Sequence, residues 1–239
     1  MNGMPLRFFL VLLSVILLSM VGCENNHAPN ADNKQMNSKE ESALNQELIQ
    51  AAERGEKAKV KQLLHEGASI NATDDQGTTA VLAATYSNEV ETVRLLIEKG
   101  ADINKQDNRL DNVLLYAGAE GLLDIVKLAL EANADTSLTN RFGGTALIPA
   151  AERGHVDVVK ELLTNSDTDV NHINNLHWTA LMEAVVLSDG GKAHQEIIQL
   201  LIKYGADVTI ADKDGVTPLE HAKNKGFHNI VKLLEAAEA

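Results

Sequence analysis

The sequence is poor in cysteine, in aromatic residues and in positive charge. Cys23 is the single cysteine among 239 residues, so no disulfide can form within the chain. An aromatic content of 3% beside a hydrophobic content of 44% is typical of thin helices whose cores consist of Ala, Leu and Val. Lys and Arg number 21 against 34 Asp and Glu, which gives a formal net charge of −13. Phosphate backbones repel such a surface, so we expect no nucleic-acid partner.

The apolar run near the N-terminus is too short to cross a membrane. It covers residues 8–20 and is interrupted only by Ser14 and Ser19. A transmembrane helix needs about 20 apolar residues. The run therefore fits the hydrophobic region of an export signal better than it fits a membrane span.

This run ends at Val21-Gly22-Cys23, where a small residue directly precedes the cysteine. The stretch resembles the lipobox of bacterial lipoproteins, with Met20 where that motif usually has Leu. The resemblance implies that residues 1–22 are a signal peptide and that Cys23 is acylated after cleavage. The protein is then exported and membrane-anchored on the extracytoplasmic side. The alternative is an ordinary signal peptide, or a short anchor helix, with an incidental cysteine. A cysteine without a disulfide partner favours lipidation.

Residues 23–43 are rich in Asn, Asp, Glu, Lys and Ser and lack hydrophobic periodicity. This composition predicts a disordered tether behind the acylated Cys23. A flexible coil of this length reaches roughly 25 Å. We therefore expect the remainder of the chain, residues 44–239, to be held near a membrane but free to turn.

A repeat of fixed length organises residues 44–239. Six apolar β-branched residues recur at intervals of 33, 33, 33, 39 and 33 residues: Val60, Val93, Val126, Val159, Ile198 and Val231. Such a period predicts a stacked array of similar units. Each unit buries its apolar face against its neighbours, so the array offers a long surface and no central catalytic cleft.

Alignment on these positions shows the complete unit. In residues 77–104, Gly-Thr-Thr-Ala-Val is followed by Ala-Ala, then by Val-Arg-Leu-Leu-Ile and by Gly-Ala-Asp-Ile-Asn. The same order returns from Gly143 and from Asp214. The pattern resembles the ankyrin repeat, which implies an all-α solenoid with a β-turn and two antiparallel helices per unit. We predict about six units: 44–71, 72–104, 105–137, 138–171, 172–209 and 210–239.

Several positions of the unit have local structural explanations. We expect threonine hydroxyls to cap the first helices, namely Thr79, Thr145, Thr179 and Thr217. We expect left-handed residues to end the second helices, namely Gly67, Gly100, Gly205 and Asn133.

The third and fifth units depart from the pattern. The third unit has Leu110 at the turn glycine and Asn112 at the capping threonine, so we expect a distorted or specialised loop there. The fifth unit has His177 at the turn glycine and five extra residues at 188–192. These extra residues lie between two predicted helices, so we expect a flexible loop.

We find little sign of chemistry in the sequence. The eight histidines form neither an HExxH motif nor a close His/Cys set, so we predict no metal site. The Asp212-Lys213-Asp214-Gly215 stretch does not fit the register of a calcium loop. Gly143-Gly144 lacks the spacing of a phosphate loop. We therefore predict no enzymatic activity and no cofactor.

The resemblance implies that the variable loop tips and the exposed side of the first helices form a concave binding face. On this basis we predict that a protein partner contacts Tyr86, Arg109, Asp111, Glu120, Arg141, Phe142, Glu152, Arg153, Leu176 and Trp178. Arg141, Phe142 and Trp178 are the expected hot spots, because aromatic and Arg side chains dominate interface energetics. The alternative is that Phe142 and Trp178 pack locally on neighbouring loops.

The function predicted from the sequence is that of a lipid-anchored, extracytoplasmic and monomeric module that binds a protein partner. The acidic surface favours a basic partner. The alternative functions are those of an inhibitor or immunity protein for an exported enzyme or toxin, or of an assembly factor for such an enzyme.

Overall fold

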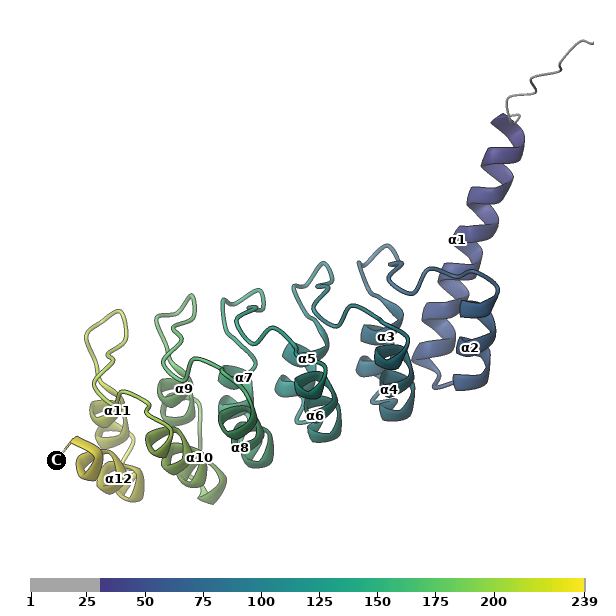
Figure 1. Cartoon of the computed structure of the whole chain (residues 1–239). Helices are drawn as coiled ribbons and strands as arrows, with labels where there is room; N and C mark the ends of the chain where they lie inside the picture. Colours follow the sequence, from purple (N-terminus) through teal and green to yellow (C-terminus); the bar gives the residue numbers. More distant parts are fainter. Residues whose placement is uncertain (1–30, 239) are drawn as a thin grey trace, which may run out of the picture.

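The computed structural model describes residues 31–238, with side chains described from Ser38 onward. The helices follow one another in pairs, and the pairs stand in single file (Figure 1). The helices are α1 (Ala31–Glu53), α2 (Lys57–His65), α3 (Ala80–Tyr86), α4 (Val90–Glu98), α5 (Val113–Ala119), α6 (Leu123–Glu131), α7 (Leu147–Glu152), α8 (Val156–Asn165), α9 (Ala180–Val186), α10 (Lys192–Lys203), α11 (Pro218–Asn224) and α12 (His228–Glu238). In this part of the chain, β pairing is limited to one isolated bridge between Thr73 and Thr79. The predicted all-α repeat fold is confirmed.

Polar side chains begin most of the first helices. The Thr79 hydroxyl accepts a hydrogen bond from the Leu82 amide at 3.3 Å, and Thr179 accepts one from Met182 at 3.2 Å. Thr217 caps α11 in the same way, as part of a capping box. These caps confirm the prediction, because each one satisfies an amide that the helix leaves unpaired.

Thr145 does not cap its helix, so this prediction is wrong. α7 begins at Leu147, and the buried Thr145 hydroxyl has no hydrogen-bond partner among the described residues. The Ile148 amide bonds the Thr145 backbone carbonyl instead, at 3.2 Å. A tight first turn thus uses a backbone acceptor in place of the side chain.

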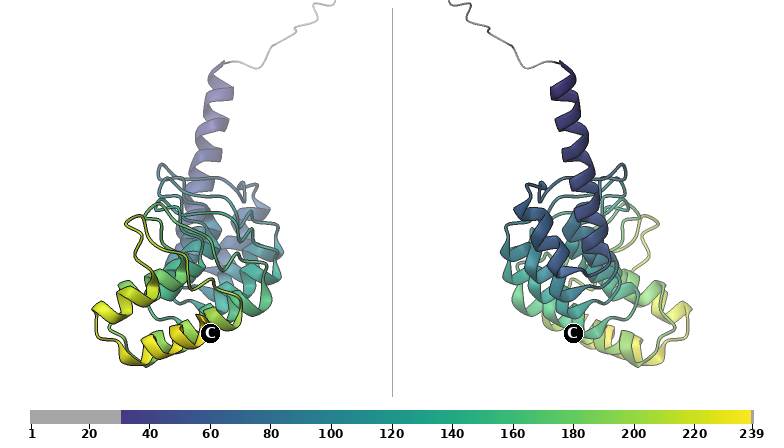
Figure 2. Two further views of the ribbon diagram at one scale, coloured as in Figure 1. Left: turned by 90° about the vertical axis from the view of Figure 1, so that its left-hand side faces the viewer. Right: turned by 90° about the vertical axis from the view of Figure 1, so that its right-hand side faces the viewer.

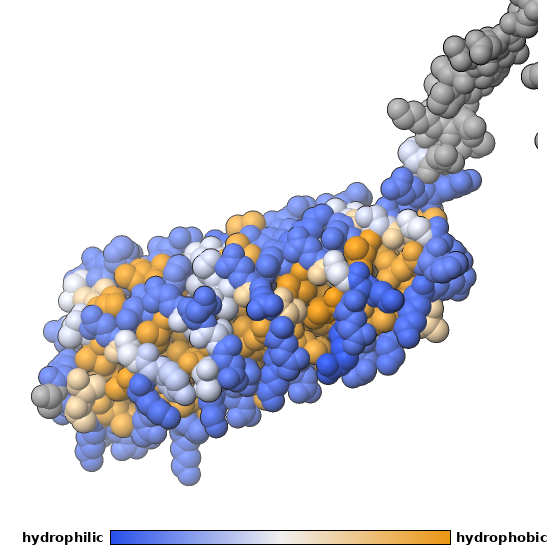
Figure 3. All heavy atoms as spheres, viewed as in Figure 1, coloured by the Kyte–Doolittle hydropathy of each residue, from blue (hydrophilic) through white to orange (hydrophobic). Residues whose placement is uncertain are grey.

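The stack has two layers. The first helices (α1, α3, α5, α7, α9 and α11) pack against one another, and the second helices do the same. Small side chains on the first helices allow this close approach, because Ala84, Ala117 and Ala150 are each 0% exposed. The space-filling view shows apolar residues along the whole row, framed by hydrophilic ones (Figure 3).

The periodic β-branched residues lie in this core. Those of the first five units are all 0% exposed, namely Val60, Val93, Val126, Val159 and Ile198. Burial of such a side chain stabilises the fold by about 1.5–3 kcal/mol. Val231 on α12 is only partly buried, because no later unit covers it within the described residues.

Loops that we call fingers connect the helix pairs, and each finger is closed at its base in the same way. An Asp or Asn side chain accepts hydrogen bonds from the amides two and four residues later, at Asp74, Asp107, Asn140, Asn174 and Asp212. Views along the row show the fingers standing over the helices (Figure 2).

The finger of the third unit keeps this geometry despite its unusual sequence. Leu110 and His177 adopt φ values of 60° and 68°, as Gly77 does at the equivalent position of the second unit with 78°. Asn112 accepts a hydrogen bond from the Leu115 amide at 2.9 Å and so replaces the capping threonine. The expected distortion of this finger is therefore absent. The predicted left-handed helix ends are confirmed at Gly67, Gly100, Gly205 and Asn133.

Residues 188–192 form a packed turn between α9 and α10. Ser188 is 8% exposed, and its hydroxyl donates to a carbonyl of α9. Gly190 has a φ of 72° and lies against the ring of Phe227. The Gln195 side chain donates to the Gly190 carbonyl at 2.7 Å. The expectation of a flexible loop is wrong here, because these contacts fix the turn to its neighbours.

α1 extends far beyond its partner helix (Figures 1 and 2). Leu48, Ala51 and Ala52 are buried and anchor its C-terminal half. The prediction of a disordered tether is wrong for residues 31–43, which are helical, because extending an anchored helix costs less than nucleating one. The predicted signal peptide (residues 1–22), Cys23 and the first part of the tether lie outside the described residues. Over residues 31–238, no helix has both the length and the apolar character needed to cross a membrane.

Candidate binding surface

A cavity of about 330 Å³ lies where three fingers meet the first helices of units three to five. α5, α7 and α9 contribute to its floor, and the fingers of the same units form its walls. Eight of the ten residues predicted to contact a partner line this cavity, namely Arg109, Asp111, Glu120, Arg141, Phe142, Glu152, Arg153 and Leu176. The repeat register brings them together, because equivalent positions of stacked units face the same side.

Tyr86 lies beside the cavity and fixes one of its walls. Its hydroxyl donates to Asp107 at 2.7 Å, and its ring meets the Tyr116 ring edge-on at 4.4 Å between centroids. The Arg109 guanidinium lies 5.0 Å from the centre of the Tyr86 ring. Burial, followed by the hydrogen bond to Asp107, raises the pKa of Tyr86. Tyr86 therefore positions Arg109, and its hydroxyl is already engaged inside the protein.

Ion pairs hold two arginines of the wall in place. Arg109 lies 3.5 Å from Asp111, and Arg153 of the fourth unit pairs with Glu120 of the third at 2.5 Å. The side chains of Arg153 and Glu120 are 45% and 43% exposed. Exposed pairs of this kind contribute up to about 1 kcal/mol to stability. Their main effect is to orient the wall of the cavity.

The rim of the cavity is apolar and open to solvent. Phe142 is 57% exposed, Leu176 is 52% exposed and Leu187 is 49% exposed. The Arg141 guanidinium stacks on the Phe142 ring at 4.7 Å. Trp178 is half-buried and does not line the cavity, although its amide bonds the Asn174 side chain at the base of the finger. The structure thus separates Phe142 and Arg141, which reach the cavity, from Trp178.

Glu183 on α9 is the one charged residue of the cavity lining that the sequence interpretation missed. It is only 5% exposed, and it accepts a hydrogen bond from the Asn174 side chain at 2.7 Å. Burial, followed by the negative charge of Glu152, raises the pKa of Glu183 to about 7, and the hydrogen bond from Asn174 opposes this rise. Its signal in the sequence is a carboxylate within the apolar run Ala180-Leu181-Met182-Glu183-Ala184.

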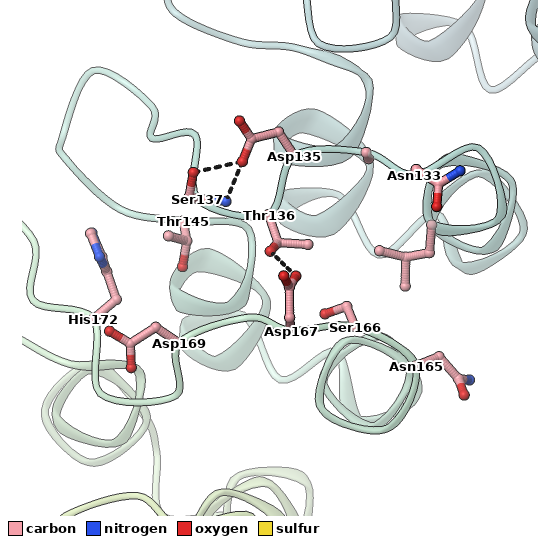
Figure 4. Close-up of a pocket in the computed structure, with 12 residues that line it drawn as sticks. Asn133, Asp135, Thr136, Ser137, Thr145, Asn165, Ser166, Asp167, Asp169 and His172 are labelled. Atoms are coloured by element: carbon pink, nitrogen blue, oxygen red, sulfur yellow. Dashed lines mark hydrogen bonds between the residues drawn. The ribbon is translucent and has the colours of Figure 1, made fainter.

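A second, more polar cleft of about 640 Å³ separates the third and fourth units near the ends of their second helices (Figure 4). Its carboxylates serve local structure. Asp135 accepts hydrogen bonds from the amide and the hydroxyl of Ser137, and Asp167 accepts one from Thr136 at 2.8 Å. Because the same Asp turn recurs at Asp207, we regard this cleft as a consequence of the stacking.

Residues 38–238 contain no group of three or more His, Cys, Asp or Glu side chains arranged to hold a metal ion. Three histidines instead bond backbone carbonyls. His155 contacts Ala119 and His194 contacts Glu152, so both link one unit to the preceding unit. His172 contacts the Gly143 carbonyl in the preceding finger at 2.7 Å. These histidines have structural roles.

Comparison with known proteins links this arrangement to a family. The model for ankyrin repeats in three copies matches residues 19–107, 48–140 and 114–212. These overlapping segments cover more than half of the chain. YahD of Escherichia coli (strain K12), whose name describes it as an ankyrin repeat protein, is 49% identical over 79 residues. That match covers 33% of this chain and 39% of YahD, well under two thirds of its length.

The human Notch-regulated ankyrin repeat-containing protein is 36% identical over 72 residues, which are 30% of this chain and 59% of that protein. Two crystal structures are similar over much more of the chain. An ankyrin repeat domain from Acinetobacter baumannii AYE superposes with a TM-score of 0.78 and 48% identity, over 80% of this chain and 97% of that one. The ankyrin repeat protein EF0377 gives a TM-score of 0.76 and 40% identity, over 79% and 96% of the two chains.

Proposed function

This chain belongs to the ankyrin-repeat family of protein–protein interaction modules, and we propose that it binds a protein partner over the cavity of units three to five. The exposed apolar rim carries the proposal. Phe142, Leu176 and Leu187 lie around one cavity, each about half exposed. In a protein–protein interface, apolar and aromatic side chains at the centre supply most of the binding energy, and the polar residues around them exclude water. The apolar residues around this cavity would form such a centre.

The walls of the cavity support rigid recognition. Arg109, Glu120 and Arg153 are held by ion pairs and hydrogen bonds within the protein. Side chains fixed before binding lose little entropy in the complex. We therefore propose a preformed surface that changes little when the partner arrives.

We further propose that the domain acts outside the cytoplasm, held to a membrane by a lipid on Cys23. The apolar run of residues 8–20 and the small residue before Cys23 support this proposal. Anchoring would raise the local concentration of the domain near membrane partners. Labelling with radioactive palmitate tests it, and equal incorporation into the wild type and the Cys23→Ala variant would refute lipidation.

Site-specific photocrosslinking tests the binding surface. A photoreactive residue placed at Leu176 in the full-length protein should capture a defined partner in cells. The same residue at Lys127, which is exposed on α6, is the matched control on the second-helix layer. Phe142→Ala should weaken capture from position 176. Equal capture from both positions, or capture that Phe142→Ala leaves unchanged, would contradict the assignment of this surface.

A further inference from the structure

The cavity contains two carboxyl groups for which no cation is available within the described residues. Arg109 and Arg153 are paired with Asp111 and Glu120, and Arg141 stacks on an aromatic ring. Neither Glu152 nor Glu183 makes an ion pair in the described part of the chain, although both line the cavity. The carboxyl groups of Glu152 and Glu183 are therefore available to pair with a cation from another molecule.

Glu183 is the more informative of the two carboxyls because it is buried. It comes four residues after the capping Thr179, and the same first-helix register places Tyr116 and Pro149 in the cavity lining. A carboxyl group that is only 5% exposed loses most of its hydration, so it either takes up a proton or, when it is ionised, needs a close cation or hydrogen-bond donors. Asn174 supplies one donor at 2.7 Å.

The residues that line the cavity restrict which cation can pair with Glu183. The exposed apolar side chains of Phe142, Leu176 and Leu187 line the same cavity as Glu183, so a cation bound at Glu183 lies close to apolar surface. Lysine and arginine side chains combine an aliphatic stem with a cationic tip and can contact both regions at once. The formal charge of −13 on the whole chain also attracts a basic partner.

We propose that the cavity receives one lysine or arginine side chain of the protein partner, with its cationic tip between Glu183 and Glu152 and its stem against Phe142 and Leu176. This inference rests on the proposed binding function and specifies the chemistry that the surface recognises. Glu183 acts as the buried acceptor, and Asn174 holds its carboxyl in position.

Several charged groups lie on the elements around Glu183. α7 brings Glu152 and Arg153, the walls bring Arg109, Asp111 and Arg141, and α5 brings Glu120. On α11, His221 is engaged by Asp212 at 2.8 Å, and α10 carries Lys192 and His194. Among these charged groups, Glu152 is the one that contributes to the raised pKa of Glu183.

The test uses a small cation in place of the partner. The full-length protein, in detergent and with carbon-13 in its glutamate carboxyls, is titrated with n-butylguanidinium and, separately, with the neutral analogue N-butylurea. We expect saturable shifts of the Glu183 and Glu152 signals with the cation and none with the urea. Glu183→Gln keeps an acceptor for Asn174 and should weaken n-butylguanidinium binding about tenfold. Glu131→Gln, an exposed charge removal on α6, should leave it unchanged.

The pH dependence gives an independent readout. With a pKa of about 7, the charged fraction of Glu183 should rise about tenfold from pH 6 to pH 8. Because the neutral side chain, like glutamine, should still bind about tenfold more weakly, the affinity for n-butylguanidinium should rise about fivefold over the same range. Glu183→Gln should remove this rise. Equal responses to the cation and the urea, or a pH profile unchanged in Glu183→Gln, would overturn the inference. If a partner is captured from position 176 but the protein does not prefer n-butylguanidinium to N-butylurea, this inference alone is refuted. If no partner is captured from position 176, the proposed function is refuted.

Discussion

Burial of the Glu183 carboxyl should make the free protein less stable as the pH rises from about 4.5 to about 7. Its pKa rises from 4.5 to about 7 on folding. Between these values the folded protein holds a proton that the unfolded chain has released. The free energy of unfolding therefore falls with increasing pH over this window and shows no further change from this group above it. At about 1.4 kcal/mol per pKa unit, the loss amounts to roughly 3 kcal/mol.

Glu183→Gln isolates this effect, because glutamine can still accept from Asn174 but does not ionise. Relative to wild type, the variant should gain about 2.5 kcal/mol more stability at pH 8 than at pH 5, because part of the loss in the wild type has already occurred below pH 5. Urea unfolding at both pH values measures the difference. The fluorescence of Trp178, the single tryptophan of the chain, reports on the same unit. Glu131→Gln should show no such pH-dependent difference. An equal effect of Glu183→Gln at both pH values would refute the assignment of a buried, titrating carboxyl.

Three further stability predictions follow from local geometry, each measured by urea unfolding. Thr179→Ala should cost about 1 kcal/mol because it removes a cap, and Thr145→Ala should cost clearly less because the Thr145 hydroxyl makes no cap bond. Equal costs would contradict this difference. His177→Gly should stabilise the protein by about 1 kcal/mol, since φ is 68° and left-handed backbone is unfavourable for a residue with a Cβ. A loss of stability would show that the imidazole makes a compensating contact. Gly190→Ala should destabilise by more than about 1 kcal/mol, because φ is 72° and the new Cβ would lie 2.7 Å from the Phe227 ring. Unchanged stability would mean that the turn adapts freely.

The repeat period was enough to predict the stack, because the same few residues recur wherever the same contacts recur. Thr179 and Gly205 have the roles that their positions in the unit predict, whereas Thr145, at the position equivalent to Thr179, does not cap its helix. The prediction was wrong where a segment depends on its neighbours. The polar composition of residues 31–43 gave no sign of a helix that propagates from the anchored half of α1. The turn at residues 188–192 is fixed by Phe227, which lies in a later unit.

The sequence predicts most of the charged residues that line the cavity, but not the buried Glu183. Arg141, Phe142 and Leu176 could be assigned to one face because the register of an array is readable from its period, and they line one cavity. Glu183 was missed because burial of a single carboxyl depends on three units at once. Trp178 is predicted from its residue type and its place on the finger, but it does not line the cavity, because a position in the repeat does not by itself fix the direction of a side chain.

Recognition by this array depends on the differences between its units. The fourth residue after the capping position is Ala83 in the second unit, followed by Tyr116, Pro149, Glu183 and His221 in the later ones. A common backbone presents all five to the same side, but only the middle three line the cavity. The repeat pattern therefore accounts for the stability of the stack, whereas the specificity of binding must lie in these departures from it. An array in which all five were alanine would keep the helix pairs and lose both the Tyr116 ring and the buried Glu183 carboxyl.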